Sequence, residues 1–127
     1  PRITPDDLDA GRHYPSMEGR EVFKHAVTRM PEAALEALRA NAMEVEEVDL
    51  FIAHQANARI SEGVRKKLGI SEDRMFNNIH RYGNTTGASI PIALAEAVRS
   101  GKVRSGDLLC LVAFGSGFTW GSALVRW

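Results

Sequence analysis

The stretch "DLFIAHQANARI", residues 49–60, contains a short apolar run that ends directly in polar side chains. Residues 50–53 mix branched and aromatic side chains, which is typical of a buried strand. The run ends in His54, and "ARISEGVRKKLG", residues 58–69, follows as a predicted amphipathic helix that stops at a glycine. The inward-facing residues of that helix would be Ile60, Val64 and Leu68. A strand that feeds a helix in this way indicates an α/β unit.

The segment upstream of this unit predicts a long helix over residues 18–42. Its apolar positions recur at helical spacing and include Val22, Phe23, Ala26, Val27, Met30, Ala34, Leu35 and Leu38. Pro31 lacks a backbone N–H, so a kink or two abutting helices is expected there. Residues 1–16 hold three prolines, a glycine and few apolar side chains. They predict an irregular lead-in, and residues 17–127 are expected to form the domain.

The segment downstream predicts further alternation of strands and helices. "MFNNIHRYGNTTGAS", residues 75–89, is typical of a short strand that leads into a glycine-punctuated loop. "SIPIALAEAVRSG", residues 89–101, predicts a helix with Ser89 as its N-cap. Residues 108–114 and 118–127 predict two paired strands. The whole is a layered α/β fold, and its runs that are apolar on all sides favour a chain that is part of something larger.

Composition limits the classes of protein to consider. The chain has 127 residues, enough for one domain, and its 16 Lys plus Arg balance 16 Asp plus Glu. No overall charge therefore favours a nucleic-acid partner. The one cysteine, Cys110, excludes an intrachain disulfide framework and fits a reducing compartment. No apolar run reaches the roughly 18 residues that a membrane span needs, so a cytoplasmic protein is expected.

His54 is the first candidate for chemistry. On its own, a histidine at a strand end is most simply a structural residue whose ring bonds a backbone carbonyl. Its position favours a second interpretation, because α/β proteins bind ligands where strands end and helices begin. The small residues Ala56 and Ala58 would leave space around the ring.

Asn84, in "YGNTTG", is the second candidate. Gly-Asn pairs are common in turns, and that is the simpler interpretation. An asparagine also offers an N–H donor that does not ionise. Together with a neutral histidine N–H, it could hold a carbonyl oxygen that is becoming an oxyanion.

The third candidate is "FGSGF", residues 114–118. Two glycines between strands predict a tight hairpin. The same glycines would also let the backbone approach a ligand and direct an N–H toward it. The segment lacks the glycine spacing and lysine of a phosphate loop.

Other polar or reactive residues carry weaker signals. Cys110 lies in an apolar strand, where an inert buried thiol is expected. His13, His25 and His80 share no metal-ligand spacing with one another or with Cys110, so no metal site is predicted. Lys24, Arg59, Arg65, Lys66 and Lys67 form either a solvated face or a basic patch for an acidic partner.

Three segments in order, "HQANARI", "RYGNTTGASIPIALAEAV" and "AFGSGFTWGSALVRW", resemble the C-terminal half of 3-oxoacyl-(acyl-carrier-protein) synthase III, a family of condensing enzymes. The likeness covers nearly the whole chain from "MEGREVFKHAV" onward. It implies a thiolase-like fold, in which two similar α/β halves pack as a five-layered αβαβα assembly. This chain would be one half.

The resemblance also implies roles for several residues. His54 and Asn84 match the family's histidine and asparagine, which donate hydrogen bonds to the thioester oxygen of malonyl-carrier protein as it loses carbon dioxide. Phe114 matches a phenylalanine that lines the active site. The backbone N–H of Ser116 would help to hold the oxyanion formed at the acyl-cysteine. Some family members have glycine there, but a backbone donor survives that difference.

The partners are likewise implied by the family. Lys24 and Arg59 fall where the acidic acyl carrier protein docks, and Asn57 aligns with a residue near the pantetheine arm of coenzyme A. The reactants would be an acyl-CoA and malonyl-carrier protein, with no cofactor. The family's nucleophilic cysteine lies in the N-terminal half, and Cys110 matches it neither in context nor in position. A homodimer is also implied.

Two other functions share these motifs. One is a related condensing enzyme of polyketide or quinolone type, or an acyltransferase, that uses the same histidine and asparagine. The other is a non-catalytic binding or dimerisation module that kept the fold and lost the chemistry. The intact His54 and Asn84 favour an enzyme, and the missing cysteine favours the module.

Overall fold

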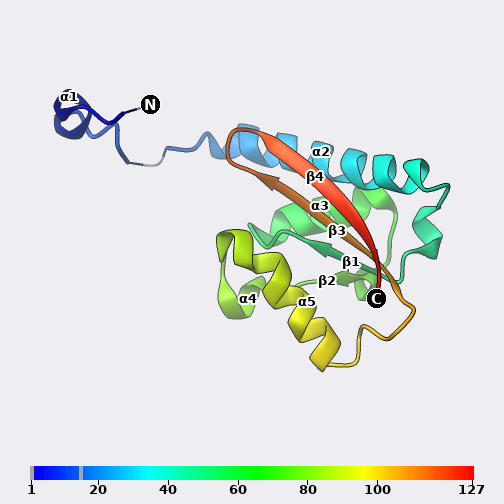
Figure 1. Ribbon diagram of the computed structural model, residues 1–127. Helices are drawn as coiled ribbons and strands as arrows, with labels where there is room; N and C mark the ends of the chain where they lie inside the picture. Colours follow the sequence, from blue (N-terminus) through cyan, green and yellow to red (C-terminus); the bar gives the residue numbers. More distant parts are fainter. Residues whose placement is uncertain (1, 15) are drawn as a thin grey trace.

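The computed structural model describes residues 2–14 and 16–127 and contains a four-stranded sheet with helices on both faces (Figure 1). The elements are α1 (Pro5–Asp9), α2 (Gly19–Ala40), β1 (Leu50–Ala53), α3 (Ala58–Leu68), β2 (Met75–Phe76), α4 (Ile79–Tyr82), α5 (Ser89–Arg99), β3 (Leu108–Gly115) and β4 (Thr119–Arg126). Single 3₁₀ turns lie at Val45–Glu47, Glu72–Arg74 and Thr86–Ala88. The predicted alternation of strands and helices is confirmed.

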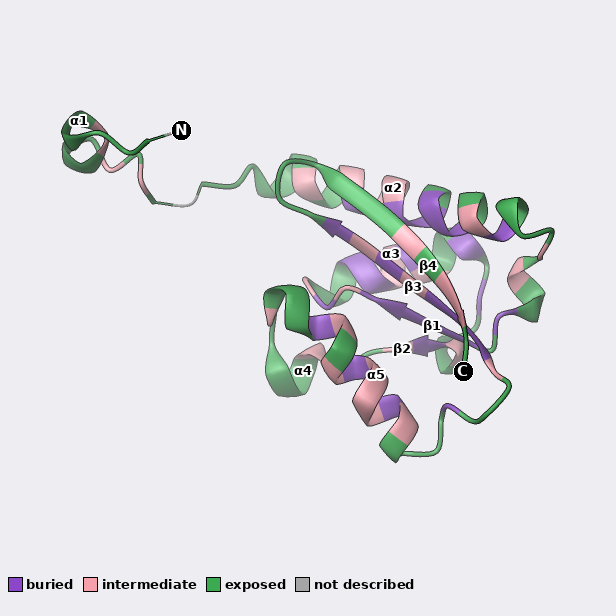
Figure 2. Cartoon of the chain, viewed as in Figure 1, coloured by how far each residue is buried: buried purple, intermediate pink, exposed green. Residues whose placement is uncertain are grey.

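The strands lie in the order β2-β1-β3-β4. β1 pairs with β2 and β3 in parallel, and β3 pairs with β4 in the antiparallel direction. The three parallel strands therefore end at the same edge of the sheet. Strand β4 stands at the opposite side from β2, and Figure 2 shows it as exposed or half-buried along its length, whereas β1 is buried throughout.

Successive residues of β1 face two separate cores, which explains why the strand is apolar on both faces. Phe51 and Ala53 join the core beneath α2 and α3. Leu50 and Ile52 join the core beneath α5. Helices α2 and α3 thus cover one face of the sheet, and α5 covers the other (Figure 1).

Helix α2 is one continuous helix of 22 residues, so two abutting helices at Pro31 was the wrong alternative. Its buried residues continue on both sides of the proline: Ala26, Met30, Pro31, Ala33, Ala34 and Leu38. The Ser122 hydroxyl of β4 also donates to the Ala33 carbonyl oxygen at 2.7 Å. Packing along the whole helix outweighs the one backbone hydrogen bond that a proline removes.

The lead-in contains a short helix that the sequence analysis assigned to irregular chain. Thr4 caps α1, since its hydroxyl accepts from the Asp7 N–H while the Asp7 carboxylate accepts from the Thr4 N–H. Pro5 at the first helical position is already set for a helix. None of residues 2–14 is buried, and α1 lies apart from the sheet in Figure 1. The boundary of the domain near residue 17 stays a prediction.

Helices α2 and α3 approach closely at Gly63, and this contact gives a stability prediction. A Cβ at this position would lie 2.9 Å from both γ carbons of Val27. We expect Gly63→Ala to lower the free energy of unfolding by about 1–3 kcal/mol through overpacking, although alanine is the better helix former. Urea denaturation measures the change. Gly19→Ala is the control, because a Cβ there meets nothing within 4 Å. Equal stability of Gly63→Ala and the parent would refute close packing at this point.

Candidate functional site

Several candidate residues lie at the edge of the sheet where the parallel strands end. His54 follows β1, Phe114 lies near the end of β3, and Asn78 comes shortly after β2. The backbone N–H of His54 donates to the Val112 carbonyl at 2.8 Å. The pairing of β1 with β3 therefore extends to His54 and fixes the position of its backbone at the end of the strand. This edge is where open α/β sheets bind ligands.

The ring of His54 is half-buried and is held by one side chain. Its Nδ1 lies 2.5 Å from the hydroxyl oxygen of Ser89, the first residue of α5. Burial lowers the pKa of His54 below its ordinary value of 6.5. The imidazole is therefore neutral at physiological pH, which is the state required of a hydrogen-bond donor that must not carry charge.

Ser89 is not the N-cap that the sequence predicts. The N-cap of α5 is Ala88, and Ser89 lies inside the first turn at 2% exposure. The three residues before it, Thr86–Ala88, form a 3₁₀ turn. The helix therefore begins one residue earlier than it would with Ser89 as its N-cap. The serine is thereby free to face His54 instead of capping backbone N–H groups.

Gln55 is a structural residue of this edge that the sequence analysis did not single out. It is 1% exposed and its amide N–H groups donate to the carbonyls of Ala53, at 2.8 Å, and Phe76, at 3.3 Å. Its amide oxygen accepts from the backbone N–H groups of Asn78, at 3.0 Å, and Ile79, at 3.2 Å. One buried side chain thus joins the ends of β1 and β2 to the start of α4.

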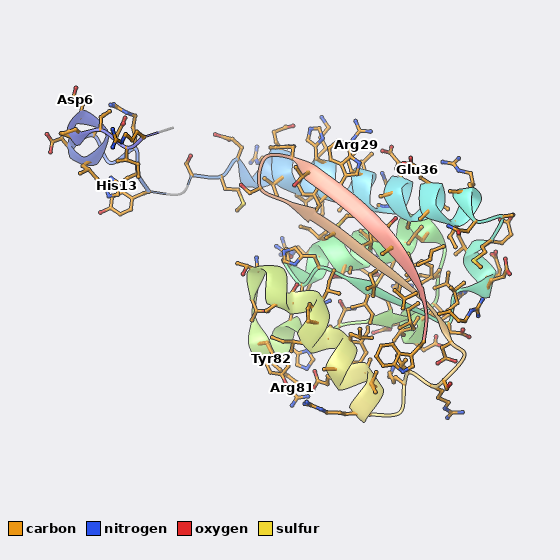
Figure 3. The ribbon with its side chains drawn as sticks, viewed as in Figure 1. Asp6, His13, Arg29, Glu36, Arg81 and Tyr82 are labelled. Carbon is orange, nitrogen blue, oxygen red and sulfur yellow. The ribbon has the colours of Figure 1, made fainter. Side chains whose placement is uncertain are left out.

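The same edge continues through Asn78 into α5. The Asn78 side chain donates to the Glu96 carboxylate at 2.8 Å, and Glu96 also forms an ion pair with Arg81. Figure 3 labels Arg81 and its neighbour Tyr82, which lie on α4 beside α5. The ion pair fastens α4, and with it the start of the loop that carries Asn84, to α5.

Asn84 occupies an exposed turn between α4 and α5. Its Oδ1 accepts from the Thr86 N–H at 2.9 Å, which is the turn role that the sequence allows. The side-chain N–H₂ group has no hydrogen-bond partner within the part of the chain that the structure describes. The turn role and the proposed donor role of Asn84 do not exclude each other, because the turn uses the side-chain oxygen and not the side-chain N–H₂ group. No hydrogen bond joins Asn84 to His54 in the described residues, but the Asn84 loop enters α5 at the serine that contacts His54.

The predicted hairpin is confirmed, and an aromatic cluster holds its tip. Strands β3 and β4 pair from Leu108↔Arg126 to Gly115↔Thr119. The ring of Phe114, a buried residue, packs edge-on against Phe118, with centroids 5.5 Å apart, and stacks on Trp120 at 6.2 Å. Phe118 in turn contacts His25 of α2 at 4.9 Å.

The tip itself is exposed and tightly bent. Ser116 is exposed, and its carbonyl accepts from the Thr119 hydroxyl at 3.1 Å. Gly117, with φ of +75°, and Phe118, with φ of +53°, adopt left-handed backbone. The guanidinium of Arg29, labelled on α2 in Figure 3, lies 5.3 Å from the Trp120 ring. Ser116 is thus carried on a turn that α2 supports from one side.

The remaining candidates lie on helices α2 and α3. Lys24 and Arg59 are exposed, and neither forms an ion pair with a described carboxylate. Asn57 is the N-cap of α3, where its side chain accepts from the Arg59 N–H at 2.9 Å. That capping bond is a structural reason for an asparagine at this position, independent of any ligand.

Cys110 has no features of a nucleophile. It is fully buried in the core beneath α2 and α3, and burial raises its pKa from 9.0 to about 12. A thiolate is therefore scarcely formed at neutral pH.

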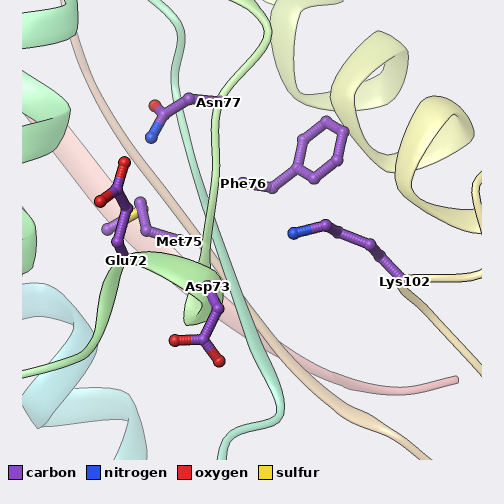
Figure 4. Close-up of a pocket in the computed structure, with 6 residues that line it drawn as sticks. All are labelled: Glu72, Asp73, Met75, Phe76, Asn77 and Lys102. Carbon is purple, nitrogen blue, oxygen red and sulfur yellow. The ribbon is translucent and has the colours of Figure 1, made fainter.

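Two open hollows are lined by residues other than His54 and Asn84. One, of about 570 Å³, runs along β2 between Glu72, Asp73, Phe76 and Lys102 (Figure 4). The other, of about 600 Å³, lies between α4 and α5 near Tyr82 and Arg99. Within residues 2–14 and 16–127, no group of three or more His, Cys, Asp or Glu side chains is placed to hold a metal ion. Across the same residues, no helix has both the length and the apolar character to cross a membrane.

Comparison with known proteins agrees with this arrangement. Residues 38–127 match the family model for the C terminal of 3-oxoacyl-(acyl-carrier-protein) synthase III. A beta-ketoacyl-(acyl-carrier-protein) synthase III of Roseiflexus castenholzii is 51% identical over 124 residues, which cover 98% of this chain and 38% of that protein. The crystal structure of the Aquifex aeolicus synthase III has a TM-score of 0.88 and 50% identity over 90% of this chain and 37% of that one. The Pseudomonas aeruginosa synthase III has a TM-score of 0.90 and 36% identity over 100% of this chain and 40% of that one.

The fold is the thiolase-like fold, of which this chain forms a partial α/β half. The chain belongs to the 3-oxoacyl-(acyl-carrier-protein) synthase III family and corresponds to its C-terminal domain. It spans about 38% of the length of the curated relatives that it matches.

Proposed function

We propose that this chain is the C-terminal catalytic half of a condensing enzyme that joins an acyl-CoA starter to malonyl-carrier protein at the start of fatty-acid biosynthesis. The observation that carries the proposal is His54: a neutral, half-buried imidazole at the carboxyl edge of the sheet, with one nitrogen held by Ser89. Family membership supports the reaction class, since the relatives are named as synthases of this type.

The reaction requires a donor site for a thioester oxygen. When the malonyl group loses carbon dioxide, the electron pair of the broken C–C bond moves toward the thioester, and negative charge develops on its oxygen. His54 and Asn84 each supply an N–H donor to that oxygen. The acyl-enzyme thioester has formed beforehand, when the cysteine of the N-terminal half attacked acyl-CoA and coenzyme A left as its thiolate. The carbanion attacks this thioester, and Phe114 lines the space from which carbon dioxide departs.

The second step forms an oxyanion on the acyl carbonyl. The backbone N–H of Ser116, at the tip of the hairpin, donates to it. Collapse of this intermediate releases the cysteine as a thiolate and leaves the 3-oxoacyl-carrier protein. Hydrogen bonds carry the stabilisation in both steps, so the scheme uses acyl-CoA and malonyl-carrier protein as reactants and needs no further cofactor.

The nucleophilic cysteine comes from an N-terminal half in this proposal. Cys110 is buried among apolar side chains and far too weak an acid to serve. The carrier protein docks on the exposed cations Lys24 and Arg59, which belong to the adjacent helices α2 and α3. Asn57, at the start of α3, lies near the pantetheine arm. A homodimer in the cytoplasm is the assembly and location that we propose.

Two alternatives are tested by the same preparation. A related polyketide or quinolone-type condensing enzyme, or an acyltransferase, would keep the oxyanion chemistry and differ in its acyl substrate. A non-catalytic dimerisation module would show neither decarboxylation nor acyl transfer. Coexpression of the chain with an N-terminal half from a close relative, followed by an assay for malonyl decarboxylation and condensation with a panel of acyl-CoA starters, separates the three. Absence of decarboxylation in a folded, assembled preparation would refute the proposal.

The chain without that half is expected to take up no stable acyl group from radiolabelled acetyl-CoA. Burial raises the pKa of Cys110 to about 12, so its thiolate is not available at pH 7 to 9. The folded protein holds this proton more tightly than the unfolded chain. The thiol therefore supports folding below its ordinary pKa and loses that contribution as the pH rises toward 12. Intact-mass analysis after incubation measures acylation, Cys110→Ala is the control, and acylation of Cys110 would overturn the assignment of the nucleophile to another segment.

A further inference from the structure

The contact between Ser89 and His54 links two buried or half-buried groups that are 35 residues apart in sequence. The Ser89 hydroxyl oxygen lies 2.5 Å from Nδ1 of His54, and it also accepts a hydrogen bond from the backbone N–H of Gln55 at 3.3 Å. Ser89 is 2% exposed, so water does not compete for its hydroxyl group. The hydrogen-bond partners of the Ser89 hydroxyl are therefore protein groups.

The Ser89 hydroxyl has one hydrogen-bond acceptor for its proton among the described residues. A serine hydroxyl carries one proton to donate and two lone pairs that accept. The Gln55 N–H uses one lone pair. Apart from Nδ1 of His54, no acceptor bonds this hydroxyl among the described residues, and a buried hydroxyl proton without an acceptor costs roughly 1–3 kcal/mol. Donation to Nδ1 satisfies the group, and it makes Nδ1 the acceptor.

We infer that Ser89 is the positioning residue of His54: its hydroxyl donates to Nδ1 and holds the imidazole in the neutral form whose proton is on Nε2. The inference rests on the proposed function, because it explains how His54 presents an N–H donor to the thioester oxygen. A neutral imidazole has one N–H, and a proton on Nδ1 would leave Nε2 as an acceptor that repels the developing oxyanion. The choice of tautomer is therefore the choice between a donor and an acceptor at the reacting oxygen.

The anchoring of Ser89 makes this contact rigid. Ser89 opens a helix of 11 residues, and the Gln55 N–H that it accepts belongs to the residue next to His54. Gln55 is itself fixed by four side-chain hydrogen bonds to β1, β2 and the start of α4. The hydroxyl therefore contacts both the ring and the adjoining backbone, which sets the orientation of the imidazole as well as its tautomer.

The direct test is a spectroscopic measurement of the tautomer. The full chain is labelled with ¹⁵N in its histidine rings, and His54 is assigned by comparison with His54→Gln. Spectra that correlate the ring C–H protons with both nitrogens distinguish a protonated from an unprotonated nitrogen. We expect Nε2–H and a bare Nδ1 in the parent, a large loss of this preference in Ser89→Ala, and recovery in Ser89→Thr, which keeps the hydroxyl.

Ser61→Ala is the matched control. Ser61 is another buried serine, 1% exposed, and its hydroxyl has no hydrogen-bond partner in the part of the chain described. Its removal should leave the His54 spectrum unchanged. A proton on Nδ1 in the parent, or a Ser89→Ala spectrum identical to that of the parent, would overturn the inference.

A kinetic measurement separates this inference from the proposed function. In the enzyme assembled with its N-terminal half, Ser89→Ala should slow malonyl decarboxylation about tenfold or more. That is less than the roughly 10²–10³-fold expected when a donor is removed outright. Ser89→Thr should restore most of the rate. If His54→Ala leaves the rate unchanged while the parent shows Nε2–H, the proposed function fails and the tautomer assignment stands. If His54→Ala is inactive while the parent shows Nδ1–H, the role of Ser89 fails alone.

Discussion

Replacement of His54 by alanine is expected to reduce malonyl decarboxylation by the assembled enzyme by about 10²–10³-fold, the usual cost of removing one oxyanion donor. The backbone of His54 continues the strand pairing through the Val112 carbonyl and does not depend on the side chain, so the variant should fold. The rate of carbon dioxide release from malonyl-carrier protein measures the effect. Acylation of the enzyme by acetyl-CoA should fall much less, because that step does not use this donor in the proposed scheme.

His80→Ala is the control for this experiment, since His80 is an exposed histidine of α4. A sharper companion variant is Asn84→Asp, which keeps an oxygen to accept from the Thr86 N–H and so preserves the turn. It removes the amide donor and adds a negative charge where an oxyanion forms. Decarboxylation at the parent rate in His54→Ala would end the assignment of this residue to catalysis, and an active Asn84→Asp would leave Asn84 with its turn role alone.

Gln55→Ala is expected to cost about 3–5 kcal/mol in the free energy of unfolding. The side chain is 1% exposed and makes four hydrogen bonds. Its loss leaves backbone groups of the buried residues Ala53 and Asn78 and of the half-buried Ile79 without their Gln55 partner, at roughly 1–3 kcal/mol for each buried group, and also opens a cavity. Urea denaturation monitored by circular dichroism measures the change.

Asn41→Ala is the matched control for the Gln55 experiment. Asn41 is also an amide, but it is exposed and makes one side-chain hydrogen bond, to the Ala37 carbonyl at 2.8 Å. Its replacement should change the free energy of unfolding by less than about 1 kcal/mol. A similarly small change in Gln55→Ala would mean that the sheet edge does not depend on this amide.

Local sequence patterns predicted most of the helices and strands. The strand at Leu50–Ala53 is specified by a short apolar run, and the helix that stops at Gly69 and the β3–β4 hairpin are specified by apolar spacing and glycine. Continuity of α2 through Pro31 could not be predicted in the same way. It depends on contacts with β4 and α3, which come from distant parts of the chain.

The side-chain network of the site was less predictable than the fold. Gln55 follows a histidine in the sequence with nothing to show that it is buried, and its partners Phe76, Asn78 and Ile79 lie more than 20 residues away. Ser89 carries a strong N-cap signal, but the preceding 3₁₀ turn starts the helix earlier and turns the hydroxyl toward His54. The turn role of Asn84 is confirmed by the hydrogen bond from the Thr86 N–H to its Oδ1, whereas the role of its amide N–H₂ as an oxyanion donor stays a prediction.

The adjacency of His54 and Gln55 has a consequence for protein engineering. One of the two residues faces the site, and the next ties the ends of two strands to α4. A chimera that exchanges residues 54–57 between family members, but leaves residues 76–79 from the original parent, would separate Gln55 from the backbone groups with which it forms hydrogen bonds. The two segments form one unit of recombination, although a whole helix lies between them in the sequence, so crossover points in a chimeric library belong before residue 54 or after residue 79.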